Sequence, residues 1–224
     1  MYRERPSRVP GGFVWTSRAT GDDTRVLPDG CMDLLWDGRR IVVAGADTHA
    51  QLIRTEPGTV MTGLRFAPGF APRVLGLPAD ALTDRHVPLD AIWSADRVRR
   101  ATDALASSAR PGRELEAVAL AAAPGPDADT ELVDQVVALT RAGWATAAIA
   151  ERVGLSARQL QRRSSAAFGY ATKTLHRVLR LQHALALVRD GARAADSAAR
   201  AGYADQAHLA RDVRDLAGVS LTQL

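Results

Sequence analysis

The chain has 224 residues, 46% hydrophobic and 24% charged, which excludes wholesale disorder and predicts one large or two small domains with packed cores. It has no run of eighteen apolar residues and no apolar stretch of a secretory signal, so we expect neither a membrane span nor export. Its one cysteine, Cys31, allows no internal disulfide and fits a reducing cytoplasm. The net charge of +4 is uneven, because residues 131–224 hold 13 basic and 8 acidic side chains, a balance that suits a polyanionic partner.

The first seventy residues carry the pattern of β-strands. Short apolar segments alternate with Gly, Pro and Asp, as in GFVWTS, TRVLP, CMDLLW, RIVVAG, AQLIR and TVMTGLRF. Asp37-Gly38, between two apolar runs, predicts a hairpin with a type I′ turn. Strands of this number and length predict a small barrel or sandwich, with a cupin-like version among the candidates.

The pattern turns helical from Ser94. ADRVRRATDALAS and RELEAVALAAA predict two helices, and APGPDAD over 123–129 predicts a linker. Beyond residue 130 each predicted helix ends on a glycine, which reaches the left-handed conformation without steric cost. We therefore predict an α+β chain with a β-rich sensor or dimerisation domain over 1–93, a helical connector and linker over 94–129, and an all-helical domain over 130–224.

The helical part contains an internal repeat. AIAERVGLSARQLQRR and SAARAGYADQAHLARD align position by position, each with a short helix, a glycine, a capping Ser156 or Asp205, and a second helix. This order is typical of a helix-turn-helix unit. A helix over about 172–189 joins the two units and spans roughly 27 Å at 1.5 Å per residue. Two reading helices placed at its ends would lie about one DNA turn apart, roughly 34 Å.

These residues resemble a known family. GLSARQLQRR, GYADQAHLARD and LAGVS are similar to the double helix-turn-helix domain of AraC/XylS-type transcriptional regulators over residues 130–224. More loosely, RVLPDGCMDLLWDG and VVAGADT resemble an uncharacterised N-terminal domain of actinobacterial members. The resemblance implies a sequence-specific, cytoplasmic DNA-binding regulator that is no enzyme and has neither cofactor nor metal. It implies double-stranded DNA as the partner, with RNA polymerase, a small-molecule effector and a second copy of the chain as further candidates.

The resemblance also assigns roles to single residues. Base reading falls to Arg158, Gln161 and Arg162 in the first unit and to Gln206, His208 and Arg211 in the second. Arginine pairs with guanine and glutamine with adenine, so these residue types suit the task. The residues themselves, apart from the resemblance, suggest phosphate contact or positioning of these helices by Ser156, Arg163, Lys173, Arg177 and Asp205, with solvated surface as the alternative for Arg163.

The sequence departs from the family pattern at three positions. Ser164 stands where an aromatic residue is usual, Val213 where Phe is common, and Thr172 where Pro is common. Ser164 falls on the predicted buried line of its helix, where a large ring would bury more apolar surface. We therefore expect the first unit to be less rigidly packed, and an aromatic residue at position 164 to raise the melting temperature.

Two other functions stay open from the residues alone. Cys31 is a candidate reactive thiol, which would make the chain a thiol-modification sensor or a DNA-repair-type regulator. An enzyme on the N-terminal barrel is a weaker alternative, because Cys31, Asp33, His49 and His86 match no metal-ligand spacing and no catalytic set is present. Trp15, Trp36 and Phe66 fit either the wall of an apolar ligand cavity or an ordinary core.

Overall fold

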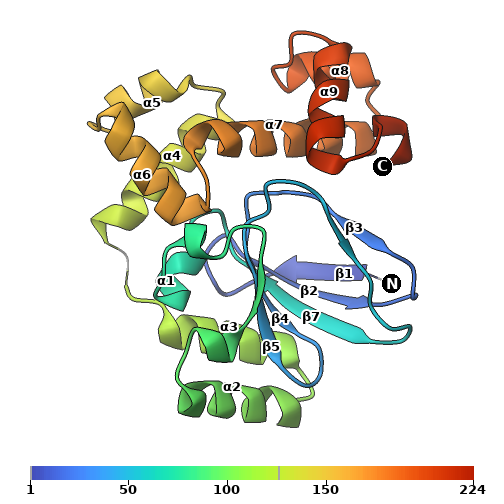
Figure 1. Ribbon diagram of the computed structural model, residues 1–224, viewed down its shortest axis with the longest axis vertical. Coiled ribbons are helices and arrows are strands. Elements are labelled where there is room, and N and C mark those ends of the chain that lie inside the picture. Colours follow the sequence, from blue (N-terminus) through green and yellow to red (C-terminus); the bar gives the residue numbers. More distant parts are fainter. Residues whose placement is uncertain (1, 126) are drawn as a thin grey trace.

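An open antiparallel sheet forms the centre of the β-rich part of the chain. The computed structural model describes residues 2–125 and 127–224 (Figure 1). Six strands pair in the order β1-β2-β7-β4-β5-β8, and β3 and β6 form a separate two-stranded ribbon. Their bounds are β1 Tyr2–Pro6, β2 Phe13–Arg18, β3 Thr24–Val26, β4 Asp33–Trp36, β5 Ile41–Ala44, β6 Gln51–Ile53, β7 Val60–Arg65 and β8 His86–Pro88.

The α+β prediction is confirmed, and the sheet is open, with β1 and β8 at its edges. The six strands predicted from apolar segments are all present. The two edge strands were not predicted, because YRERP has no apolar alternation and HVP is only three residues long. Edge strands gain their conformation from pairing with a neighbour, so their own sequences carry little signal.

The predicted hairpin at Asp37-Gly38 exists, but its turn differs. Trp36 pairs with Ile41, which leaves a four-residue loop, and of its residues only Gly38 has a positive φ, at 91°. The Asp37 carboxylate accepts hydrogen bonds from the backbone N–H groups of Arg39 and Arg40, both at 2.8 Å. The type I′ prediction is therefore wrong, because the Asp37 side chain closes the turn without positive φ at its own position.

One helix packs against the sheet and a second helix packs on the first. Helix α3 (Pro111–Ala122) contacts β7 and β2, and α2 (Ala95–Ser107) lies on α3; Leu115 and Ala119 of α3 are fully buried. Short elements complete this layer, namely α1 (Ala71–Leu75), η1 (Ala79–Ala81) and η2 (Leu89–Ala91). The two helices of segment 94–129, predicted as a connector, thus cover the sheet; Pro126 of the predicted linker lies outside the described residues.

The helical part consists of six helices and a short terminal turn. They are α4 (Ala128–Arg141), α5 (Thr146–Arg152), α6 (Ala157–Phe168), α7 (Thr172–Arg189), α8 (Ala194–Arg200), α9 (Gln206–Ala217) and η3 (Leu221–Gln223). Figure 1 shows α5 and α6 at one end of α7, and α8 and α9 at the other. No helix among the described residues is both long and apolar enough to cross a membrane.

Two separate apolar cores support this arrangement. The larger core runs from the sheet into α5, α6 and the first half of α7, and includes Leu160, Phe168 and Leu175. The smaller core joins the second half of α7 to α8 and α9, and includes Leu181, Leu209 and Val213. The first helix-turn-helix unit therefore shares its core with the sheet, whereas the second has one of its own.

The structure revises the expectation for Ser164. This side chain is 1% exposed, and its hydroxyl lies 2.7 Å from that of Thr172, which is also buried. Two of the three departures from the family pattern are thus partners in one buried hydrogen bond. The site is closed to solvent and its two hydroxyls are hydrogen-bonded to each other, so a polar pair stands there in place of the expected apolar contact.

We predict that Ser164→Phe lowers the melting temperature, because a ring would overpack a closed site and leave the Thr172 hydroxyl without its partner, at a cost of about 1–3 kcal/mol for each effect. Thermal unfolding of the two proteins, followed by circular dichroism, measures the change. Ser165→Ala, on the same helix but only half-buried, is the matched control. An unchanged or higher melting temperature for Ser164→Phe would restore the original expectation.

A buried ion pair ties strand β1 to helix α3. The Glu116 carboxylate is fully buried and accepts hydrogen bonds from both terminal nitrogens of Arg5, at 2.9 and 3.1 Å, and from the backbone N–H of Arg8 at 2.8 Å. Burial alone would raise the pKa of Glu116, but the bonds from Arg5 and Arg8 outweigh it and hold the pKa at about 2.

This pair predicts a specific loss of stability in acid. The pKa of Glu116 is lower in the folded chain than its ordinary value of 4.5, so its stabilising effect is complete above about pH 4.5 and fades as the pH falls towards 2. Glu116→Gln should therefore lower the melting temperature clearly at about pH 7 and much less at about pH 3. Glu131→Gln, at an exposed position, is the control. The difference between its melting temperature and that of the wild type should not shrink between about pH 7 and about pH 3.

Candidate nucleic-acid interface

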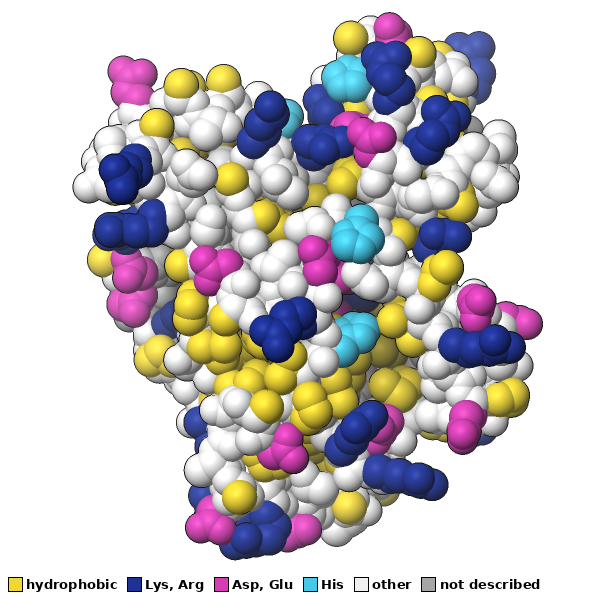
Figure 2. Space-filling view, viewed as in Figure 1, with side chains coloured by type: hydrophobic (Ala, Val, Ile, Leu, Met, Phe, Trp, Pro, Cys, Tyr) yellow, Lys and Arg dark blue, Asp and Glu magenta, His cyan; other side chains and the backbone are white. Residues whose placement is uncertain are grey.

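Two matched helix pairs stand at the ends of α7. The turns before α6 and α9 contain Gly154 and Gly202, with φ of 68° and 81°. Helices α6 and α9 both have 12 residues, and the connecting α7 has 18. Figure 2 shows two upper lobes with basic side chains on both and a notch between them; in Figure 1 these lobes are the two helix pairs. The predicted tandem helix-turn-helix arrangement is confirmed.

The predicted capping residues start the two reading helices. The Ser156 hydroxyl accepts from the Gln159 backbone N–H at 3.3 Å, and the Gln159 amide oxygen accepts from the Ser156 N–H at 2.9 Å. The Asp205 carboxylate accepts from the His208 N–H at 2.6 Å. Both residues therefore set where a helix begins, and the remaining N–H groups at these helix starts suit a phosphate.

The first reading helix presents its predicted side chains to solvent. Arg158, Gln161 and Arg162 are exposed, whereas Leu160 and Ser164 point into the core. Arg163, predicted to contact phosphate, forms a surface ion pair with Asp129 of α4. Lys173, at the start of α7, is exposed.

On α9, only some of the side chains predicted to read bases are exposed. Gln206 and Arg211 are exposed, but the His208 ring is half-buried and meets the Tyr203 ring edge-on, with centroids 5.1 Å apart. Its Nε2 lies 3.5 Å from the Arg180 guanidinium. Helical spacing correctly placed His208 on the outer side of α9, but it could not show that Tyr203 and Arg180 cover that spot. His208 is therefore a packing residue in this structure, not a free side chain.

Arg177 is also engaged within the protein. Its guanidinium donates to Asp212 at 2.8 and 3.2 Å and to Asp215 at 3.1 Å. Arg180 donates to the other carboxylate oxygen of Asp212 at 2.7 Å. Sequence reasoning missed Asp212, which is 5% exposed. The available signal was the matching three-residue spacing of Arg177 and Arg180 on one helix and of Asp212 and Asp215 on the other.

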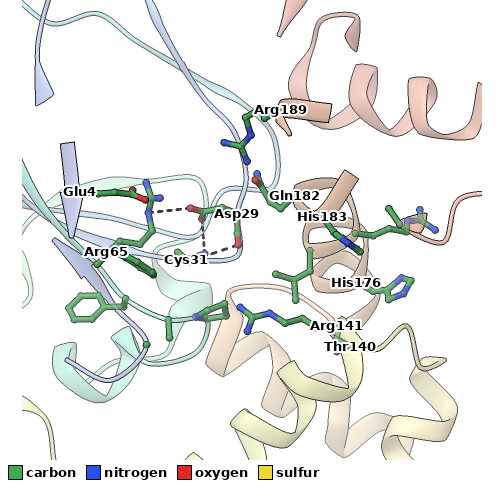
Figure 3. A pocket seen from close by; sticks show the side chains of 18 of the residues that line it. Glu4, Asp29, Cys31, Arg65, Thr140, Arg141, His176, Gln182, His183 and Arg189 are labelled. Carbon is green, nitrogen blue, oxygen red and sulfur yellow. Dashed lines mark hydrogen bonds and ion pairs between the residues drawn. The ribbon is translucent and has the colours of Figure 1, made fainter. Parts of the chain in front are cut away.

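A cleft of about 760 Å³ lies between the sheet and the helical part (Figure 3). On the sheet side, Arg65 forms ion pairs with Asp29 at 3.3 Å and Asp33 at 3.6 Å. On the helical side, Arg141 and Arg189 extend towards the sheet, whereas the His176 ring points away. Aromatic walls come from Tyr2, Phe13 and Phe66, so the cleft combines apolar surface with arginine side chains.

Cys31 lines the same cleft. Burial, followed by the Asp29 and Asp33 carboxylates, raises the pKa of its thiol well above the ordinary value. The thiolate is the reactive form, so this environment disfavours the proposed thiol sensor.

The possible metal ligands are dispersed: His49 contacts Asp84 at 3.6 Å, and His86 lies on edge strand β8. Among the described residues no three His, Cys, Asp or Glu side chains gather as a metal site would require. Trp36 and Phe66 belong to the core, and half-buried Trp15 donates to Asp33 at 3.1 Å.

Comparison with known proteins agrees with this architecture. A family described as "Helix-turn-helix domain" matches residues 149–224, and the "Domain of unknown function (DUF6597)" matches residues 13–88. No curated protein matches the chain in sequence. Among solved structures, ToxT from Vibrio cholerae O395 is 8% identical with a TM-score of 0.47, over 100% of this chain and 95% of that chain. Wild-type ToxT from Vibrio cholerae strain SCE256, bound to an unsaturated fatty acid, is 11% identical with a TM-score of 0.48, over 93% and 92%. Residues 149–224 therefore match a helix-turn-helix domain family, and residues 13–88 match the DUF6597 family.

Proposed function

We propose that this chain is a transcription regulator that reads a specific DNA sequence with α6 and α9. The two helices enter two successive segments of the major groove on one face of the duplex. The observation that carries the proposal is the matched pair of 12-residue helices at the two ends of the 18-residue α7. The length of α7, roughly 27 Å at 1.5 Å per residue, suits neighbouring groove segments about 34 Å apart. This function places the protein with DNA in the cytoplasm.

The exposed side chains suggest which residues contact bases and which contact phosphates. Base reading falls to Arg158, Gln161 and Arg162 on α6 and to Gln206 and Arg211 on α9, all of them exposed. Ser156 and Asp205 position the helices that carry them. Lys173 is an exposed candidate for phosphate contact. Arg163 would have to exchange Asp129 for a phosphate, a modest cost because the ion pair is at the surface.

Arg162 and Arg211 occupy equivalent positions in the two units and provide the sharpest test. We predict that Arg162→Ala or Arg211→Ala weakens binding to the preferred duplex by about 1–3 kcal/mol and relaxes the preference at one base pair, a different one for each variant. The duplex is one that the full wild-type chain selects from a random DNA pool, and fluorescence anisotropy on single-base variants of it measures both effects.

Lys173→Ala is the comparison variant. As a phosphate contact it should weaken binding to all duplexes alike and reduce the slope of log affinity against log salt by about 1. If Arg162→Ala and Arg211→Ala behaved in the same uniform way, their proposed contact with base edges would be contradicted. If the wild-type chain selected no sequence at all, sequence-specific reading itself would be contradicted.

We also propose that the cleft receives a small-molecule effector. It lies between the DUF6597 domain and the helical domain, and 760 Å³ is within the usual range for a small-molecule site. The guanidinium of Arg141, on the last residue of α4, faces it without an ion-pair partner among the described residues. Together with the aromatic walls, this favours an organic anion with an apolar body.

Small aromatic and aliphatic carboxylates are the probes for this proposal. We predict that at least one carboxylate in a panel raises the melting temperature of the wild-type chain, and that Arg141→Gln reduces this increase because the guanidinium binds the carboxylate. Arg100→Gln, on α2 and away from the cleft, should leave the increase unchanged. An increase that survives Arg141→Gln, or a panel without effect, would contradict a carboxylate site at Arg141.

A further inference from the structure

We propose that Asp212 is a positioning residue for DNA reading: held by Arg177 and Arg180 of α7, its carboxylate sets the orientation of α9 and so the place of the second reading helix in the groove. The inference rests on the proposed function, because it concerns the same two reading helices. It assigns a role to a buried acidic residue that touches neither base nor phosphate.

The geometry around Asp212 is that of a preorganised clamp. One carboxylate oxygen accepts from Nε and Nη2 of Arg177, and the other accepts from Nη2 of Arg180 at 2.7 Å. The two arginines lie one helical turn apart on α7, so they hold the carboxylate at two points. Burial by itself would raise the pKa of Asp212, but the bonds from Arg177 and Arg180 outweigh it and the pKa is lowered. Asp212 is thus charged at neutral pH, and charge-assisted hydrogen bonds of this kind are strong and directional.

Arg180 extends the clamp to the turn before α9. Its guanidinium lies 4.1 Å from the centroid of the Tyr203 ring, and Tyr203 in turn meets His208. One arginine on α7 therefore contacts the turn, through Tyr203, and the reading helix, through Asp212 and His208. Two segments of the second unit, the turn and α9, are thus held by a single planar group.

Apolar packing cannot do this task alone. Leu209, Val213 and Leu216 press α9 towards the second half of α7, but apolar contact is non-directional and tolerates small rotations and shifts. The second unit also has its own core, separate from the sheet, so the larger core does not constrain α9. Hydrogen bonds from Arg25 and Ala50 hold the last carbonyls of α9, and the directional bonds to Asp212 constrain its middle. Reading base edges demands placement to within about 0.5 Å.

The first unit has a weaker counterpart at the equivalent position. The alignment that matches Leu160 with Leu209 also matches Arg163 with Asp212. Arg163 of α6 pairs with Asp129 of α4, the helix that precedes its own helix pair, so the same link exists with the charges exchanged. There both side chains are exposed, 45% and 77%, and a surface pair of this kind contributes little to the orientation of α6. Losing it would release Arg163 for phosphate, which affects affinity but carries no base preference. The first unit instead draws its orientation from the core that it shares with the sheet.

This contrast provides a matched pair of variants, Asp212→Asn and Asp129→Asn. The probe is the duplex selected from a random pool by the full wild-type chain, and Arg211→Ala identifies which half of it α9 reads. We expect Asp212→Asn to weaken binding by about tenfold or more and to flatten base discrimination in the α9 half while the α6 half keeps its preferences. Asp212→Glu, which retains the charge, should recover part of the discrimination. Asp129→Asn should leave the base discrimination of both halves as in the wild type, with an affinity equal to or slightly above it because Arg163 is released for phosphate.

Two further measurements separate positioning from simple loss of structure. Circular dichroism spectra and melting curves report folding, and Arg177→Gln, which leaves the Arg180 bond in place, should give a milder change of the same kind if Asp212→Asn proves unstable. Unchanged discrimination in the α9 half for folded Asp212→Asn, or for Arg177→Gln when Asp212→Asn does not fold, would overturn the inference. So would an equal loss of discrimination in both halves. A wild-type chain that selects no duplex would instead defeat the proposed function.

Discussion

The arrangement of the whole helical part depends on one constraint: helix α7 is shared by two cores. Leu175 and Leu179 in its first half are packed into the core of the sheet and the first unit, and Leu181 and Leu185 in its second half are packed into the core of the second unit. An 18-residue helix that is buried along its length behaves as a rigid spacer. The separation of α6 and α9 follows from it, and so does their suitability for neighbouring turns of DNA.

The β-rich part holds the helical part at helix ends. Thr83 donates to the Gly169 carbonyl after α6 at 2.8 Å, Arg25 donates to the Ala217 carbonyl at the end of α9 at 2.8 Å, and the Ala50 N–H donates to the Leu216 carbonyl at 2.7 Å. The last carbonyls of a helix have no partner within the helix, so they are natural points of attachment. Both helix pairs are therefore tied to the domain that borders the cleft, and Arg180 belongs at once to the cleft wall and to the group around Asp212.

Much of the site could be predicted because its signals are local. Gly202, the Asp205 cap and the spacing of Leu209 and Val213 are set by the conformations that a tight turn and an amphipathic helix require, and these depend on neighbours in the chain. The same local signals predicted helix α7 and the exposure of Arg162 and Arg211. It did not reveal the partners of His208 and Arg177 within the protein, because most of these partners come from other helices and leave no mark within a few residues.

The sequence by itself determined the order of the elements, the tandem repeat and the two equivalent helices α6 and α9, because periodicity, caps and glycines act over a few residues. Only the tertiary structure decided the rest. It paired Ser164 with Thr172, added to the two edges of the sheet strands whose sequences carry no apolar alternation, and buried Asp212 between two arginines. These are contacts between different helices and strands, and their energies depend on burial and direction, which the sequence expresses only once the chain is folded.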